Sequence, residues 1–300
     1  MGSSFEGMEG MEGMEGMIGL VAGSSGGGRA LYADRIDLPF VTVENPPGTP
    51  ISQVRFWIPT FPRGVWTPEW YAWVVLTEFA QLPGWAGWDL LPPWAKDANG
   101  NADWTSNNAQ PVITGELDGL VVAARDERAD ALGEILGQST EFISYFLNML
   151  TIPASYPATA KFLYINYFIA GFTAMVYKGK YKRPRPTMLC PALLPPVAIP
   201  GHASFPSGHS TQGHTVALAM MDVLAQRPDL AAMATDLQAL ADRIARNREI
   251  AGLHYPSDTQ AGIDLAGKTH TLLGSLIHPQ NQTPSFYQQA LAAAQAEWVP

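Results

Sequence analysis

Three short segments in the second half of the chain carry the residue types needed to bind an anion and attack it. They are residues 178–186, 205–210 and 247–258. A tetrahedral dianion such as phosphate needs several fixed donors of positive character. Arginine supplies a planar fork of donors for paired oxygens, and lysine supplies a point charge. The side chains that fit these roles are Lys178, Arg185 and Arg248.

The second segment, Phe-Pro-Ser-Gly-His-Ser, is typical of a helix start. A helix start presents free N–H groups and the positive end of the helix dipole, which favour a bound anion. Gly208 would let the main chain approach that anion closely. We therefore expect this helix start to face the anion, with His209 beside it in the first helical turn.

The third segment places His254 just beyond a predicted helix, with Asp258 four residues later. A carboxylate near a histidine fixes its tautomer and stabilises the imidazolium. An imidazole with a pKa of about 6.5 is a nucleophile when neutral and an acid when charged, so two histidines can share one reaction. We expect a rate maximum on the acidic side of neutral.

The order and spacing of these segments resemble the superfamily that joins type 2 phosphatidic acid phosphatases, bacterial acid phosphatases and vanadium haloperoxidases. Six residues separate Lys178 from Arg185-Pro186, and the second motif is Pro-Ser-Gly-His at 206–209. In the third motif, five residues separate Arg248 from His254 and three separate His254 from Asp258. The resemblance covers about residues 140–275, and it departs at Asn247, where the pattern usually has Ser.

The resemblance implies a role for each matching residue. His254 is the expected nucleophile that forms a phosphohistidine, Asp258 orients it, and His209 protonates the leaving oxygen. No metal or other cofactor is expected. The expected anion ligands are Lys178, Arg185, Ser207, Gly208 and Arg248.

The favoured interpretation is a phosphomonoester hydrolase resembling the soluble bacterial acid phosphatases, and the alternative is a haloperoxidase. In the alternative the cofactor is vanadate, His254 is the vanadium ligand, and halide is oxidised by hydrogen peroxide. The short segment between His209 and Arg248 favours the phosphatase. His202, expected in the second shell of the site, favours the haloperoxidase. A third hypothesis is an inactive module that binds an anion without turnover.

Charge and composition indicate the partners. The formal net charge is −9, which disfavours nucleic acid, yet no Asp or Glu occurs between Phe142 and Met221. We expect a small phosphorylated substrate. The single cysteine, Cys190, permits no intrachain disulfide. A Pro- and Trp-rich segment of exposed aromatic residues is compatible with a homodimer.

The chain shows no clear signal peptide, because no Lys or Arg precedes Arg29 and the first apolar run is short. The longest apolar stretch, residues 162–176, falls short of the roughly 20 residues that a membrane span needs. We therefore expect no membrane span and a soluble protein, either cytoplasmic or in a compartment that the sequence does not identify.

The sequence divides into three regions. Residues 1–30 form a low-complexity tail, residues 31–110 a Pro/Trp-rich segment that packs on the core, and residues 111–300 a helical catalytic domain. The tryptophans suit either packing or a substrate mouth, and packing is the favoured interpretation. The fold is predicted to be an all-α helical bundle. Helices are expected over residues 68–81, 117–136, 140–150, 158–177, 206–225, 229–253, 257–277 and 284–298, with a Pro-rich loop over 184–206. Thr67 is the expected N-cap of the first helix, with Pro68 at its first position, and Ser257 is the expected N-cap of the helix over 257–277.

Overall fold

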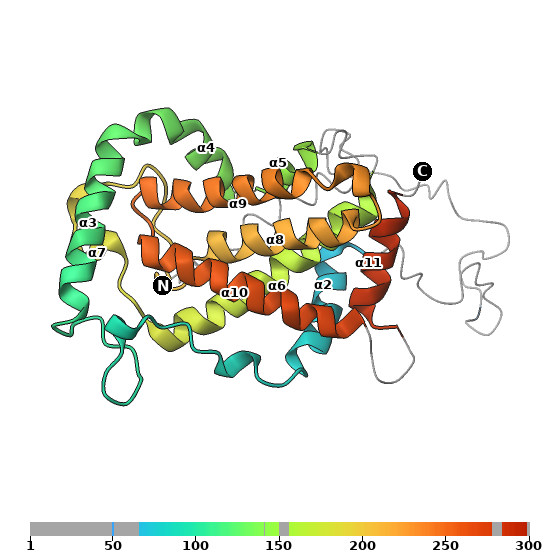
Figure 1. Ribbon diagram of the computed structural model, residues 1–300, viewed down its shortest axis with the longest axis horizontal. Coiled ribbons are helices and arrows are strands. Elements are labelled where there is room, and N and C mark those ends of the chain that lie inside the picture. Colours follow the sequence, from blue (N-terminus) through green and yellow to red (C-terminus); the bar gives the residue numbers. More distant parts are fainter. Residues whose placement is uncertain (1–49, 51–65, 141, 150–155, 278–283, 299–300) are drawn as a thin grey trace.

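The computed structural model describes residue 50 and residues 66–140, 142–149, 156–277 and 284–298. Within these ranges the regular structure is helical, apart from one isolated bridge between Lys96 and Ala102 (Figure 1). This confirms the prediction of an all-α fold. The predicted tail, residues 1–30, lies outside the described residues, as does the first half of the Pro/Trp-rich segment.

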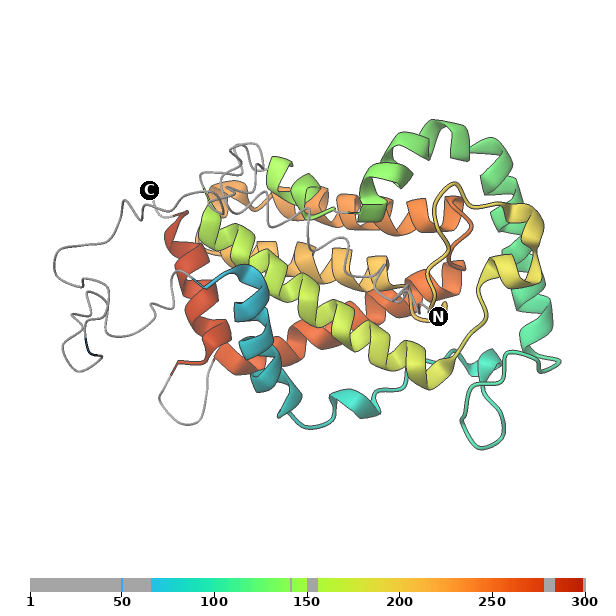
Figure 2. The ribbon, with the colours of Figure 1, turned by 180° about the vertical axis from the view of Figure 1, so that it is seen from behind.

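The centre of the bundle is α8, Gly208–Leu224, which contacts three other long helices. In Figure 1 it runs between α9, Met233–Ile250, and α10, Pro256–Gly274. Behind it lies α6, Pro157–Tyr181, which crosses the front of the bundle in Figure 2. Because its neighbours cover it, α8 is buried along most of its length, as its mixture of small and apolar residues requires.

Two helices from opposite ends of the chain close the far end of α6. They are α2, Pro68–Ala80, and α11, Phe286–Ala296. Glu78 of α2 accepts the Phe286 N–H at 2.8 Å, at the free N-terminal end of α11. The predicted start of α2, with Thr67 as N-cap and Pro68 at the first position, is confirmed.

One predicted helix, residues 117–136, is wrong in extent. The structure has two helices there, α3 over Ala109–Asp126 and α4 over Arg128–Thr140. The chain turns between them where the Arg128 guanidinium reaches three main-chain carbonyls of other segments. These belong to Leu193, Leu194 and Ile250. A tertiary contact therefore places the break, which local sequence does not signal.

The predicted boundaries before the first motif also change. Helix α5 covers only Ile143–Met149, and α6 continues one turn beyond residue 177 to Tyr181. Lys178 therefore lies on a helix and not in a loop. The chain leaves α6 at Lys182, which has a φ of 52°, in the left-handed region.

The segments around the second and third motifs also contain more turns than predicted. The loop expected over 184–206 contains α7, Pro186–Leu189, and a short 3-10 helix. The predicted helix 229–253 is a 3-10 turn followed by α9. The N-cap of α10 is Tyr255, not the predicted Ser257, because Pro256 takes the first helical position.

The ends of the long helices gather the three motifs. The C-terminal end of α9 and the N-terminal ends of α8 and α10 lie at the same end of the bundle, which α3 and α4 cover (left in Figure 1). In the part of the chain that the structure describes, none of the helices combines the length and apolar character that crossing a bilayer requires.

Candidate active site

The spacing of the third motif comes from the way α9 ends. Gly252 has a φ of 79°, and its N–H donates to the Glu249 carbonyl at 2.7 Å. The Leu253 N–H donates to the Arg248 carbonyl at 3.0 Å. These two bonds form a Schellman motif, in which the left-handed position favours glycine. The motif fixes His254 relative to Arg248.

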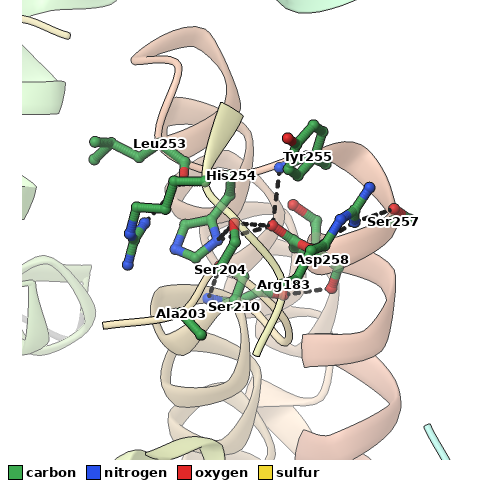
Figure 3. A network of polar contacts seen from close by, with 12 residues as sticks. Arg183, Ala203, Ser204, Ser210, Leu253, His254, Tyr255, Ser257 and Asp258 are labelled. Atoms are coloured by element: carbon green, nitrogen blue, oxygen red, sulfur yellow. Dashed lines mark hydrogen bonds and ion pairs between the residues drawn. The ribbon is translucent and has the colours of Figure 1, made fainter. Parts of the chain in front are cut away.

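His254 lies against Asp258 as predicted (Figure 3). The distance between His254 Nδ1 and Asp258 Oδ2 is 3.2 Å. The same carboxylate oxygen accepts the Tyr255 N–H at 3.1 Å and the Ser204 hydroxyl. A carboxylate only accepts, so Nδ1 carries the proton and the lone pair sits on Nε2. His254 therefore offers Nε2 as its nucleophilic atom.

The charge states of this pair follow from burial and its neighbours. Burial and the positive charge of Lys178 lower the pKa of His254 well below its usual value, although the bond to Asp258 acts in the opposite direction. Burial raises the pKa of Asp258, but the Arg183 charge and the bonds from His254 and Ser204 outweigh it and leave that pKa below its usual value. At neutral pH the pair is thus a neutral imidazole beside an ionised carboxylate.

Lys178 is a fully buried cation in the last turn of α6. Its Nζ donates to the carbonyls of Ala203 and Ser204, each at 2.9 Å. Burial lowers its pKa well below the usual value, and the charge of Arg185 adds to that effect. The ammonium is therefore held in place by main-chain oxygens alone.

Arg185 is held by the chain that leads to the second motif. Its Nε donates to the His202 carbonyl at 2.9 Å, and its Nη1 donates to the Leu253 carbonyl at 2.8 Å. Its Nη2 lies 3.1 Å from His202 Nδ1, which places His202 behind Arg185, in agreement with its predicted position. Burial lowers the pKa of Arg185 to about 10. Burial, with the Lys178 charge, lowers the pKa of His202 to about 4, so His202 is neutral.

The second motif begins α8 with Ser207 as N-cap, and its Oγ accepts the Ser210 N–H at 3.4 Å. A β-carbon added at Gly208 would lie 3.8 Å from Lys178 Cε, so the helix start faces that lysine. A β-carbon at Gly262 of α10 would lie 2.7 Å from Ser210 Cβ. Glycine at 262 therefore lets α10 pass across the start of α8.

His209 is fixed by a different element from the one that orients His254. Its Nε2 lies 3.0 Å from the carbonyl of Gln138, and its ring centroid lies 5.4 Å from that of Phe142. Because a carbonyl only accepts, Nε2 carries the proton. Burial, then the charge of Arg248, lowers the pKa of His209 to about 3. In the free protein His209 is neutral, and its predicted role as an acid requires an anion nearby.

Arg248 is almost completely buried, and its Nη2 donates to the Ile135 carbonyl at 2.8 Å. Its Nε is buried without a hydrogen-bond partner among the described residues. Burial lowers its pKa to about 10. Asn247, where the resemblance leads one to expect Ser, donates to Glu134 and Gln138 at 2.9 Å each. The unusual asparagine thus ties α9 to α4.

Three buried cations of this site, which we call the cation cluster, have no carboxylate partner in the described part of the chain. They are Lys178, Arg185 and Arg248. Their hydrogen-bond partners among the described residues are main-chain carbonyls and His202. A buried charge is costly unless an opposite charge compensates it. The cation cluster therefore favours an anion bearing more than one negative charge.

Sequence reasoning gave no role to Arg183, Ser204 or Glu116, which all contact the site or its immediate neighbours. Arg183 belongs to the first motif segment but was one basic residue among several, and neither of the others shows a local signal. Trp104 packs, as favoured: it lies 4.8 Å from the Arg183 guanidinium and donates to the Tyr181 carbonyl at 2.8 Å, whereas Trp70 and Trp73 are exposed. Within the described ranges, no group of three or more His, Cys, Asp or Glu side chains has the geometry to hold a metal ion.

The motif-bearing part of the chain matches a known family. Residues 160–281 match the model of the PAP2 superfamily. Over this region the chain is similar to the PAP2 superfamily. The match covers the first, second and third motifs and begins after α3, α4 and α5.

The similar curated proteins are named as phosphatases. The chain is 31% identical over 112 residues to decaprenylphosphoryl-5-phosphoribose phosphatase of Mycobacterium tuberculosis, in strains CDC 1551 / Oshkosh and ATCC 25618 / H37Rv. The alignment covers 36% of this chain and spans 56% of each relative. A transmembrane PAP2 type phosphatidylglycerolphosphate phosphatase from Bacillus subtilis superposes with a TM-score of 0.43 and 19% identity, over 57% of this chain and 87% of that chain. The similarity to the family rests on the sequence match.

Proposed function

We propose that this protein hydrolyses phosphate monoesters through a phosphohistidine on His254. The observation that carries the proposal is the cation cluster beside a neutral histidine whose Nδ1 is bonded to Asp258. A phosphate dianion supplies the missing negative charge, and its phosphorus is the electrophile for Nε2. Similarity to proteins named as phosphatases supports the same chemistry.

In the proposed first step, the phosphoryl oxygens bind to the cation cluster, to Ser207 and to the Gly208 N–H. His254 Nε2 attacks phosphorus, and the bond from phosphorus to the ester oxygen breaks. The positive charge that develops on the imidazole is stabilised by the Asp258 carboxylate through Nδ1. His209 gives its proton to the leaving oxygen, so the alcohol departs neutral.

In the second step, water attacks the phosphohistidine, His209 takes a proton from that water, and phosphate leaves while His254 becomes neutral again. His209 must be protonated before the first step, although its pKa in the free protein is about 3. A bound dianion offsets the charges of Arg248, Lys178 and Arg185, which lower that pKa. Substrate binding therefore raises the pKa of His209, the acid that protonates the leaving oxygen.

The proposed substrate is a small soluble phosphomonoester. The names of the similar mycobacterial proteins describe a different kind of molecule, a phosphoribose attached to a decaprenyl phosphate. Both kinds present a terminal phosphate to the same donors, so the assay compares a soluble ester with a polyprenyl-linked one. A higher kcat/KM for the polyprenyl-linked ester would replace the proposed substrate and keep the proposed reaction.

The alternative, a vanadate-dependent haloperoxidase, is favoured by His202 behind Arg185. The donor set fits vanadate, because the cation cluster suits its oxygens and His254 Nε2 suits the metal. When bound there, vanadate would supply the activation of hydrogen peroxide for halide oxidation. Apart from that step, the residues would act as for phosphate: they bind and orient the anion.

One experiment separates these functions. Chelator-treated protein is assayed with p-nitrophenyl phosphate from pH 5 to 8, with and without orthovanadate, and vanadate-loaded protein is tested for bromination with bromide and peroxide. We expect hydrolysis that vanadate inhibits. Bromination without hydrolysis would select the haloperoxidase, and phosphate binding without either reaction would select an inactive module.

The matched variants are His254→Ala and His270→Ala. We expect His254→Ala to lose turnover and to form no acid-labile phosphoprotein with a radiolabelled substrate, while its circular dichroism stays unchanged. His270 lies near the C-terminal end of α10, 2.8 Å from Asp222 of α8, and its variant should retain turnover. Near-normal rates in His254→Ala would contradict the mechanism.

A further inference from the structure

Arg183 is a buried arginine of the first motif segment that does not belong to the cation cluster. Its side chain is fully buried, and Nη1 donates to Asp258 Oδ1 at 2.7 Å (Figure 3). Asp258 uses its other oxygen, Oδ2, for His254. Arg183 and His254 therefore bind opposite oxygens of one carboxylate, and each affects how much charge the other receives.

The second nitrogen of the same guanidinium reaches α3. Arg183 Nη2 donates to Glu116 Oε2 at 2.8 Å, and Glu116 Oε1 accepts the Ser257 N–H at 2.7 Å. Glu116 thus joins Arg183 to the first turn of α10, which also carries Asp258. Helix α3 lies outside the residues that match the PAP2 superfamily model. This chain therefore adds a carboxylate to the active site from outside the matched region.

Aromatic rings hold the plane of the guanidinium. The Tyr255 ring centroid lies 3.7 Å from Arg183 Cζ, and those of Trp104 and Trp94 lie 4.8 and 5.7 Å away. Stacking against rings fixes an arginine more strongly than it fixes a flexible ammonium. The guanidinium therefore has one orientation, in which its two nitrogens contact two different carboxylates.

We propose that Arg183 and Glu116 are positioning residues, which fix the orientation of Asp258 and the amount of its negative charge that acts on His254. This rests on the proposed function of His254 as the nucleophile. Arg183 draws charge away from Asp258, and Glu116 limits that effect by sharing the guanidinium. The balance decides how strongly the carboxylate stabilises the imidazolium that forms as His254 attacks.

Removing the charge of Arg183 and removing the charge of Glu116 should shift the pKa of His254 in opposite directions. Charged or titratable groups face the His254–Asp258 pair from each packed element: Lys178 from α6, Arg183 and Arg185 from the following segment, Glu116 from α3, and Tyr255 from the start of α10. Arg183→Gln deletes a positive charge and should raise the pKa of His254 by about one to three units, the range for charges roughly 12 to 4 Å apart at an effective dielectric near 20. Glu116→Gln deletes a negative charge and should lower it, by less, because Glu116 is farther from His254.

The first readout does not depend on turnover. Protein with 15N-labelled histidine is titrated by NMR from pH 8 down to the lowest pH at which circular dichroism shows a folded protein, free and saturated with inorganic phosphate, and the His254 signal is assigned with His254→Asn. Opposite shifts in Arg183→Gln and Glu116→Gln support the proposal. Shifts of the same sign, or none in either variant, would overturn it. Circular dichroism checks that both variants fold. If Arg183→Gln does not fold, Glu116→Gln, which is a nearly isosteric change, still tests the proposal.

The second readout separates geometry from charge. Arg183→Lys keeps the charge but loses the fork, so we expect a shift under half of that in Arg183→Gln together with a tenfold or greater fall in kcat at unchanged KM. The matched control is Glu127→Gln, which breaks an exposed ion pair with Arg246 of α9, 2.7 Å long, and should alter neither value. A wild-type protein without hydrolase activity but with opposed NMR shifts would refute the proposed function and leave the positioning role in place.

Discussion

Arg248→Met tests whether the cation cluster is held at a cost that an anion offsets. Burial lowers the pKa of Arg248 from 12.5 to about 10. One pKa unit corresponds to about 1.4 kcal/mol, so the buried charge costs about 3 kcal/mol of folding free energy. The arginine is charged in both the folded and unfolded states below pH 10, so this cost is fully present at neutral pH. It is relieved only as the pH rises through about 10.

The variant also loses the hydrogen bond from Arg248 to the Ile135 carbonyl, which contributes about 1 kcal/mol to the free energy of unfolding. Methionine fills a similar volume without a charge, so the phosphate-free variant should be more stable than the wild type by about 2 kcal/mol. For a chain of this size that corresponds to a rise in Tm of about 5 °C. The same change should abolish the stabilisation that phosphate gives the wild type, which is about 2.7 kcal/mol at a phosphate concentration of one hundred times its Kd.

The assay is thermal unfolding with and without inorganic phosphate, at pH 7. The matched control is Arg246→Met, on the same helix but half exposed and paired with Glu127 and Glu249. Its free energy of unfolding should fall by up to about 1 kcal/mol, and phosphate should still stabilise it as fully as the wild type. A phosphate-free Arg248→Met that is less stable than the wild type, or one that still responds to phosphate, would refute the argument from the buried charge.

Four further predictions follow from the site. Arg185→Ala should weaken inhibition by phosphate and by vanadate at least tenfold, because it deletes a forked donor; unchanged inhibition constants would remove Arg185 from the anion ligands. Gly262→Ala should lower the free energy of unfolding by about 2 kcal/mol or more, since its β-carbon would lie 2.7 Å from Ser210 Cβ, whereas Gly267→Ala, in open space on the same helix, should be neutral or stabilising. Gly252→Ala, at a φ of 79°, should cost about 1 kcal/mol in urea unfolding and lower kcat by moving His254; a loss of stability with normal kcat would separate the turn from the site. Phosphate should raise the pKa of His209 above its free value of about 3; an NMR titration of 15N-labelled His209 with and without phosphate measures the shift, and an unchanged pKa would contradict the proposed acid.

The parts of the site that the sequence predicted are those fixed by local hydrogen bonds. The distance from Arg248 to His254 is set by the turn that Gly252 makes, and the pairing of His254 with Asp258 is set by the start of α10. The place of Ser207 at the start of α8 follows from its role as N-cap. Each of these contacts joins residues a few positions apart, so their spacing in the sequence carries the information.

Helix boundaries were less predictable where side chains distant in the sequence hydrogen-bond to main-chain groups. The break between α3 and α4 depends on Arg128 reaching carbonyls more than sixty residues away. The N-cap of α10 moved from Ser257 to Tyr255 because Pro256 fits the first helical position, and Ser257 accepts a bond from Arg183. Hydrophobic periodicity shows that a helix exists, while its ends depend on capping and on tertiary contacts.

The sequence by itself determined which side chains could bind or attack an anion, in what order they occur, and that helices carry them. Only the tertiary structure decided how their charges are compensated. Arg183 and Arg185 are both arginines of one short segment, yet Arg183 pairs with Asp258 and Glu116 while Arg185 meets only carbonyls and His202. The physical reason is that burial makes an unpaired charge costly, and which charges are paired depends on packing between helices that are distant in the sequence.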